Sequence, residues 1–270
     1  MNSSMTVNDS LPYALVTGGS KGIGYAIAKA LAKRRYNLIL VARDYSSLSA
    51  VKEHLEATYR VQVEIMSHDL SREESAGEIA KWCIERHVNL KILCNAGGLG
   101  GEKDYLSLPL DSLRHMMNLN LGSCMAMTFL LLPLLERSAP SYILNVSSLA
   151  GFAPIPSKNI YSATKAAVMY FSYALRIQLQ KKNISVSCLA PGPVFTKASI
   201  REVTEKKMGW FGMQMAVPPE EVGEMAVRKT LERKLIIVPG MLAQMSAAII
   251  RTLPKRWMTS IYNRSDPGTS

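Results

Sequence analysis

Three residues that can together move a proton lie in the middle of the chain. Tyr161 and Lys165 belong to the run Tyr161-Ser162-Ala163-Thr164-Lys165, and a helix would place them on one face, one turn apart. A free tyrosine has a pKa of about 10, which a nearby cation lowers by favouring the phenolate. Ser148 lies thirteen residues before Tyr161 and just past an apolar run, 141–146, where its hydroxyl could hold a substrate oxygen as charge develops. A lone tyrosine on a helix is usually only a half-buried aromatic side chain. The prediction of a catalytic role therefore rests on the three residues together.

A glycine-rich loop, Thr17 to Gly24, directly follows the first apolar run. Glycines allow a tight turn and the close approach of backbone to a pyrophosphate, whose charge a helix N-terminus stabilises. An ordinary strand-to-helix turn is the alternative interpretation of such a loop taken alone. The residues predicted to contact a dinucleotide here are Gly18, Ser20, Lys21, Gly22, Ile23 and Gly24.

The end of the second apolar run reads Ala42-Arg43-Asp44. Enzymes that select NAD usually place a carboxylate at this strand end, whereas an arginine accommodates the 2′-phosphate of NADP. Arg43, with Lys21, could clamp that phosphate, so the sequence predicts NADP(H) in preference to NAD(H). Asp44 could instead reach the ribose, and both cations could be ordinary solvated charges.

The elements that must position these residues alternate along the chain. Short apolar runs at 13–16, 37–41, 62–66, 90–94, 141–146, 184–189 and 235–238 are predicted strands, and 22–34, 46–58 and 161–180 are among the predicted helices. This alternation predicts an α/β fold: a doubly wound, mostly parallel sheet of about seven strands with helices on both faces, a Rossmann fold in one domain. Ligands of such folds bind at the carboxyl ends of the strands, where these motifs lie.

Taken together, these motifs resemble the short-chain dehydrogenase/reductase family across roughly Pro12 to Pro239. The glycine motif matches at Thr17, Gly18, Gly22 and Gly24. The resemblance implies that Asp69 and Leu70 lie at the adenine, that Asn95-Ala96-Gly97 supports the sheet and lines the adenine ribose, and that a segment from Pro191 to Thr196 cradles the nicotinamide. The further cofactor residues that it implies are Asp69, Leu70, Asn95, Ala96, Gly97, Tyr161, Lys165, Pro191, Gly192, Val194 and Thr196.

The same resemblance implies a catalytic set of Asn120, Ser148, Tyr161 and Lys165. Asn118 competes with Asn120 for the helix asparagine that holds a proton-relay water, and Ser147 is one residue too far from Tyr161. The implied reaction transfers hydride between NADP(H) and a ketone or secondary alcohol, with Tyr161 as general acid or base. A non-catalytic NADP(H)-binding sensor or scaffold is the alternative function.

The composition limits the other possibilities. The chain has 270 residues, four widely spaced cysteines and a formal net charge of +11; no cysteine pair or histidine cluster predicts a metal site. The positive charge favours anionic partners, but no basic stripe interleaved with aromatics suggests nucleic acid. We expect a cytoplasmic protein, since no signal sequence is evident and no stretch reaches the ~18 apolar residues that span a bilayer.

Three expectations concern substrate and assembly. A polar segment 1–11 precedes the catalytic domain 12–240, and 241–270 forms a basic amphipathic extension in which Leu242, Met245, Ile249 and Leu253 follow helical spacing. That tail resembles those of long-chain 3-oxoacyl and 3-ketosphinganine reductases and hydroxysteroid enzymes, which implies a lipophilic carbonyl substrate. Its apolar stripe could make peripheral contact with the inner membrane surface, or could instead pack on its own domain or on a second subunit. The loop 98–108 and the Met- and aromatic-rich segment 196–218 are predicted to set specificity. The apolar run 125–135 lies on the helix that members of the resembling family use to pair subunits, which implies a homodimer or homotetramer; such a face could also be simply core.

Overall fold

The computed structural model describes residues 11–100, 105–195, 216–253 and Trp257. Its sheet has seven strands in the order β3-β2-β1-β4-β5-β6-β7, and every neighbouring pair is parallel. The strands are β1 Tyr13–Thr17, β2 Asn37–Ala42, β3 Val63–Ser67, β4 Leu90–Asn95, β5 Ser141–Val146, β6 Ile184–Leu189 and β7 Ile236–Ile237. The predicted doubly wound fold is therefore confirmed.

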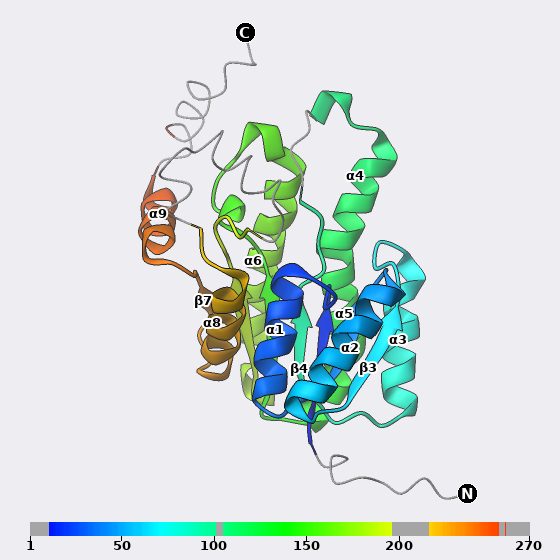
Figure 1. Cartoon of the computed structure of the whole chain (residues 1–270). Coiled ribbons are helices and arrows are strands. Elements are labelled where there is room, and N and C mark those ends of the chain that lie inside the picture. The colour runs from blue at the N-terminus through cyan, green and yellow to red at the C-terminus, as the bar shows by residue number, and fades with distance from the viewer. Residues whose placement is uncertain (1–10, 101–104, 196–215, 254–256, 258–270) are drawn as a thin grey trace, which may run out of the picture.

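Helices cover both faces of the sheet (Figure 1). Strand side chains alternate between the faces: in β1, Val16 packs with α1, α2 and α8, whereas Leu15 packs with α3, α5 and α6. The α-helices are α1 Gly22–Lys33, α2 Tyr45–Tyr59, α3 Glu73–Glu85, α4 Leu110–Met117, α5 Ser123–Arg137, α6 Asn159–Leu179, α8 Pro219–Leu231 and α9 Met241–Thr252. The short helices are η1 Tyr105–Ser107, η2 Asn118–Gly122, η3 Leu149–Gly151, η4 Pro156–Lys158 and η5 Gln180–Lys182.

The element ends differ slightly from the predictions. β7 has two residues instead of four, and α6 begins at Asn159, two residues before Tyr161. Such shifts are expected, because apolar periodicity identifies an element better than it identifies the residue at which hydrogen bonding stops. All four cysteines are free and buried in this core.

Helices α4, η2 and α5 form one helical stretch, Leu110–Arg137. It is long enough and, with a mean hydropathy of 1.5, apolar enough to cross a membrane by length and composition, which the sequence analysis did not anticipate. In the fold, its second half is a core layer: Met127, Leu131 and Leu135 are fully buried on the face shared with α3 and α6. Packing against the sheet therefore accounts for the apolar face that carries Met127, Leu131 and Leu135, whereas Phe129 of the same helix is exposed.

Helix α9 packs on the domain through small side chains. The buried residues are Ala243 and Ala247, whereas Met245 and Ile249, which we expected within one apolar stripe with Leu242 and Leu253, are exposed. Small residues let a helix approach its support closely, so α9 packs through its alanines rather than its largest apolar side chains.

Candidate active site

The glycine-rich loop is held tightly over the end of β1. Gly18 has a φ of +67°, which glycine adopts without steric cost, and its N–H donates to the carbonyl of Val41 at 2.7 Å. A Cβ on Gly24 would lie 2.1 Å from the carbonyl oxygen of Gly18, so no other residue fits there. Helix α1 begins within this loop, at Gly22, and its free N–H groups can bind an anion such as a pyrophosphate.

The ends of β1 and β4 are joined by the side chain of Thr17. Its Oγ1 accepts hydrogen bonds from the N–H groups of Ala96, at 3.0 Å, and Gly97, at 2.9 Å. The glycine-rich loop and the Asn95-Ala96-Gly97 segment thus form one rim of the strand-end crevice. Thr17 is part of the family's glycine motif, but nothing in the sequence indicated this bridging contact.

Asn95 lies below that rim, in the sheet. Its amide Nδ2 donates to Asn145 Oδ1, at 2.9 Å, and to Thr128 Oγ1, at 3.1 Å. Asn145 in turn donates to Ser172 Oγ at 3.0 Å. These polar groups are buried, and a buried polar group without a hydrogen bond would destabilise the fold. Through these hydrogen bonds, Asn95 ties β4 to β5, α5 and α6. It is 5% exposed, which favours a supporting role over direct contact with a ligand.

The ends of β2 and β3 carry charged groups with different partners. Asp44 caps α2, since its carboxylate accepts hydrogen bonds from both Ser46 and Ser47, and the Ser47 and Ser46 bonds lower its pKa to about 2. Arg43 is exposed, and its side chain makes no hydrogen bond or ion pair with the described part of the chain. The carboxylate that competed for the ribose is thus engaged in helix capping, whereas the guanidinium is available.

Asp69 lies after β3, beside the buried Leu70. Burial raises the pKa of Asp69, but hydrogen bonds from Ser71, together with the positive charges of Arg43 and His115, outweigh this and leave it below its ordinary value. The Ser71 N–H and hydroxyl donate at 3.0 and 2.8 Å. Asp69 is therefore a fixed, ionised acceptor at the strand end.

The two candidate serines after β5 make different hydrogen bonds. Ser147 is 2% exposed, and its hydroxyl donates to the backbone carbonyl of Lys165 at 2.7 Å. Ser148 is less buried; its Oγ accepts a hydrogen bond from Ala150 N–H at 3.1 Å, which leaves its own proton to donate. The geometry therefore leaves the hydroxyl of Ser148, and not that of Ser147, open to a ligand.

Tyr161 and Lys165 share the first turns of α6, and the Lys165 Nζ lies 5.8 Å from the Tyr161 ring centroid. Burial raises the pKa of Tyr161, and the Ser148 hydroxyl offsets part of that rise. The expected lowering by Lys165 is thus wrong for this structure. Burial also lowers the pKa of Lys165 from 10.5 to about 8, and its ammonium donates to the carbonyl of Val146 at 2.9 Å.

Asn120 occupies the π-helical turn η2 between α4 and α5. Its Oδ1 accepts from Leu99 N–H at 2.7 Å, and its Nδ2 donates to the carbonyl of Leu99 and to Thr164 Oγ1. A Cβ on Gly98 would lie 3.3 Å from both Asn120 Oδ1 and Lys165 Nζ, so these two polar groups adjoin the same backbone. Asn118 is exposed and donates to the carbonyl of Ser71, outside this group.

The predicted nicotinamide segment follows β6 and adjoins the Ser148 region. The carbonyl of Pro191 accepts from Leu149 N–H at 3.0 Å. Gly192 is half-buried and Val194 is buried in the core cluster of α1 and α8. Thr196 and the Met- and aromatic-rich residues 208–215 lie outside the described residues.

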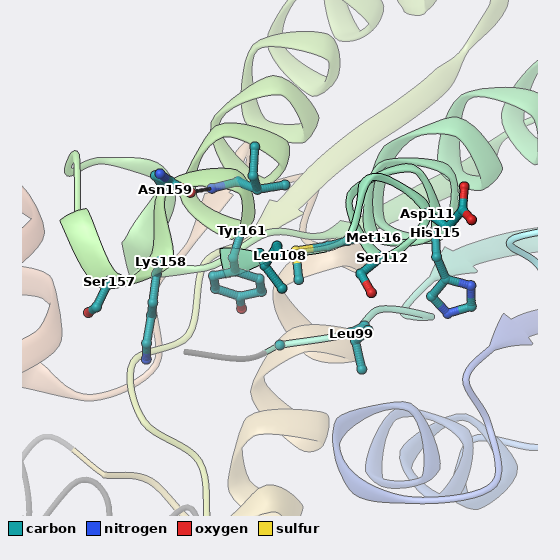
Figure 2. A pocket seen from close by; sticks show the side chains of 12 residues that line it. Leu99, Leu108, Asp111, Ser112, His115, Met116, Ser157, Lys158, Asn159 and Tyr161 are labelled. Atoms are coloured by element: carbon teal, nitrogen blue, oxygen red, sulfur yellow. Dashed lines mark hydrogen bonds between the residues drawn. The ribbon is translucent and has the colours of Figure 1, made fainter. Parts of the chain in front are cut away.

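A cavity of about 440 Å³ opens beside Tyr161 (Figure 2). The Tyr161 ring lies at its centre, with Lys158 on one side and His115 on the other. The predicted loop contributes Leu99, Gly100 and Leu108, but α4, η4 and the first turn of α6 supply most of the wall; the sequence did not indicate the part that α4 and η4 play. The lining consists of Leu99, Gly100, Leu108, Asp111, Ser112, His115, Met116, Ser157, Lys158, Asn159, Ile160 and Tyr161.

Several known proteins are similar to this chain in sequence. The very-long-chain 3-oxoacyl-CoA reductase-A of Danio rerio is 34% identical over 200 residues, 72% of this chain and 62% of that protein. Hydroxysteroid dehydrogenase-like protein 1 of Gallus gallus is 34% identical over 202 residues, 74% of this chain and 61% of that protein. This chain thus spans less than two thirds of the length of either relative.

The crystal structure of L-sorbose reductase from Gluconobacter frateurii, complexed with NADPH and L-sorbose, superposes with a TM-score of 0.76. It is 25% identical in sequence, and the match covers 86% of this chain and 97% of that one. The family model for short chain dehydrogenases matches residues 12–207. The chain therefore belongs to the short-chain dehydrogenase family of oxidoreductases.

Proposed function

We propose that this protein is an NADPH-dependent reductase of a lipophilic ketone, with Tyr161 as the proton donor. The observation that carries the proposal is the arrangement around Tyr161: the open hydroxyl of Ser148, the buried ammonium of Lys165 and the amide of Asn120 surround a phenol that borders a largely apolar cavity. These groups come from the segment after β5, from α6 and from η2, and all lie at the carboxyl edge of the sheet, the edge at which open α/β sheets bind ligands.

The glycine-rich loop fits a dinucleotide. The absence of side chains at Gly18 and Gly24, together with the start of α1 at Gly22, gives backbone N–H groups room to meet a pyrophosphate. Arg43, exposed at the end of β2, suits the 2′-phosphate of NADPH, since guanidinium binds phosphate in a bidentate manner. The use of Asp44 as a helix cap removes the carboxylate that would favour NADH.

The proposed reaction divides the work between the cofactor and two side chains. The bound cofactor supplies the hydride to the carbonyl carbon. Ser148 donates a hydrogen bond to the carbonyl oxygen, which stabilises the negative charge that develops there, and Tyr161 transfers its phenolic proton to that oxygen. Because burial raises the pKa of Tyr161, the phenol keeps its proton at neutral pH, as reduction requires.

Lys165 and Asn120 maintain this arrangement. The Lys165 ammonium, fixed by Val146 and buried next to the Tyr161 ring, supplies a positive charge beside the phenolate left after proton transfer. Asn120 holds the backbone at Leu99 through both its amide atoms, and with Lys165 it borders the path by which a proton returns to Tyr161.

The cavity supports a lipophilic substrate. Leu99, Leu108, Met116 and Ile160 contribute apolar surface near the phenol, and apolar pockets with a few polar groups are typical of sites for small organic ligands. The similarity to proteins named as very-long-chain 3-oxoacyl-CoA reductases and a hydroxysteroid dehydrogenase-like protein favours a long-chain acyl or steroid-like ketone.

The first experiment titrates the purified protein with NADPH and NADH, followed by fluorescence, and then adds a panel of ketones that includes a long-chain 3-oxoacyl ester. We expect tight NADPH binding and oxidation of NADPH that depends on the ester. Tyr161→Phe should bind NADPH normally and lose at least about 100-fold in kcat, because it lacks the proton that is transferred. Tight binding without turnover of any ketone would favour the sensor function, and wild-type rates in Tyr161→Phe would exclude the mechanism.

A further inference from the structure

Helix α9 exposes its large apolar residues on one face. Met241, Met245 and Ile249 are 77%, 58% and 57% exposed, and their spacing of four residues places them side by side along the helix. The opposite face packs on the domain through Ala243 and Ala247. We call Met241, Met245 and Ile249 the α9 stripe. Isolated exposed apolar residues are ordinary, but a contiguous row of them marks an interaction surface.

The charge around the α9 stripe indicates the chemistry of its partner. From Gly240 to Ser265 the sequence contains no acidic residue and four basic ones: Arg251, Lys255, Arg256 and Arg264. Arg251 is exposed in the last turn of α9; it lies four residues after Ala247, on the flank nearer the domain, with its guanidinium carbon 6.0 Å from the centroid of the Phe152 ring. A partner of this region must accept apolar side chains and carry negative charge.

We infer that the α9 stripe docks the protein on an anionic lipid bilayer. An amphipathic helix lies at such a surface with its apolar side chains at the acyl boundary and its basic residues among the headgroups. A second copy of the chain fits less well, because a two-fold contact would bring two identical basic segments together. The exposed methionines also suit a fluid surface, since their unbranched side chains adapt to irregular packing.

The place of α9 in the fold connects this surface with the candidate active site. Ala247 packs in one cluster with Phe152, and Leu149 packs against the same cluster; both lie in the segment that follows Ser148. A bilayer under α9 would therefore adjoin the catalytic edge of the sheet, where a lipophilic ketone could enter. This consequence rests on the proposed function, whereas the docking itself does not.

The test is co-sedimentation of the full chain with vesicles of phosphatidylglycerol and phosphatidylcholine in equal parts, compared with vesicles of phosphatidylcholine alone. We expect binding to the anionic vesicles that weakens in high salt. The variant Met245→Gln/Ile249→Gln keeps the charge and changes only exposed positions, and it should bind about tenfold more weakly because apolar surface is lost from the contact. The control Ile84→Gln/Leu110→Gln removes exposed apolar residues elsewhere and should bind as the wild type does.

Several results would overturn the inference. These are no wild-type binding to anionic vesicles, equal binding to both kinds of vesicle, or unchanged binding of Met245→Gln/Ile249→Gln. A change in the oligomeric state of that variant by gel filtration would assign the α9 stripe to a second copy instead. NADPH oxidation with a water-soluble ketone, measured in the same variants, should remain at the wild-type level, so that a failure of docking is distinguished from a failure of the proposed reaction.

Discussion

The ammonium of Lys165 is bound to the backbone carbonyl of Val146, the last residue of β5, at a distance of 2.9 Å. A lysine in this position destabilises the fold, because burial disfavours its charged form and lowers its pKa to about 8. An unfolded chain would hold that proton up to a pH of about 10.5. Lys165 thus serves the proposed reaction but lowers the stability of the folded protein.

We expect Lys165→Met to be inactive but more stable than the wild type at pH 7. The shift from 10.5 to about 8 corresponds to about 3 kcal/mol, and loss of the hydrogen bond to Val146 reduces the gain to about 2 kcal/mol. Urea unfolding of both proteins without cofactor measures the difference. Between pH 8 and pH 10.5 the unfolded wild type binds more protons than the folded one, so the wild type recovers stability there and the difference should shrink as the pH rises.

Cysteines and tyrosines of the unfolded chain also titrate in that range, and both proteins contain them. Cys124 and Cys188 interact electrostatically with Lys165, but burial raises the pKa of these two thiols to about 12 and about 11, so both stay protonated in the folded protein and their contribution largely cancels in the comparison. A difference that stays constant from pH 7 to pH 10.5 would show that the charge of Lys165 is not the cause. A less stable variant at pH 7 would show that the hydrogen bond to Val146 contributes more than burial of the charge costs.

The two adjacent serines should respond differently to removal of the hydroxyl. Ser148→Ala should lower kcat about 100-fold, because it removes the donor to the developing oxyanion; loss of the hydrogen bond from the Ala150 N–H should also cost about 1 kcal/mol of stability. Ser147→Ala should lower the free energy of unfolding by about 1 kcal/mol and leave kcat nearly unchanged, since it removes a buried hydrogen bond to the carbonyl of Lys165. Steady-state kinetics and urea unfolding of both variants check this; a larger kcat loss in Ser147→Ala would reverse the assignment.

How far the sequence predicted this molecule depends on the range of the interactions concerned. The succession of strands and helices along the chain and the glycine-rich loop follow from local patterns, because apolar runs and glycines act within their own element. The set of Ser148, Tyr161 and Lys165 could be identified because two of its members share one helix turn and the third follows the adjacent strand.

Other features depend on packing that the sequence pattern does not contain. The cavity wall joins α4 and η4 across more than forty positions of sequence. The direction of the Tyr161 pKa depends on how deeply the ring is buried, which helical spacing does not determine. The orientation of α9 depends on the short alanines at its contact with the domain, although hydrophobicity alone favours burial of its methionines.

Cofactor choice should depend on Arg43. Its side chain is exposed and makes no hydrogen bond or ion pair within the described part of the chain, so Arg43→Ala should leave the fold intact. We expect NADPH binding to weaken about tenfold, with NADH binding almost unchanged, because a guanidinium–phosphate contact is lost. Lys81→Ala, which removes an exposed cation near the end of α3, is the matched control. Equal losses for both cofactors in fluorescence titrations would show that Arg43 does not contact the 2′-phosphate.

A second apolar surface, on α5 and α6, should pair subunits. Phe129, Tyr170 and Ile177 are 76%, 73% and 75% exposed, and both helices cover the same face of the sheet. We expect a dimer or tetramer that buries these rings, and Phe129→Asp/Tyr170→Asp should dissociate it, because two unpaired charges per subunit would enter the contact. Light scattering after gel filtration measures the mass. A monomeric wild type, or an unchanged mass in the variant, would exclude this interface; the Met245→Gln/Ile249→Gln protein, altered on α9, should keep the wild-type mass.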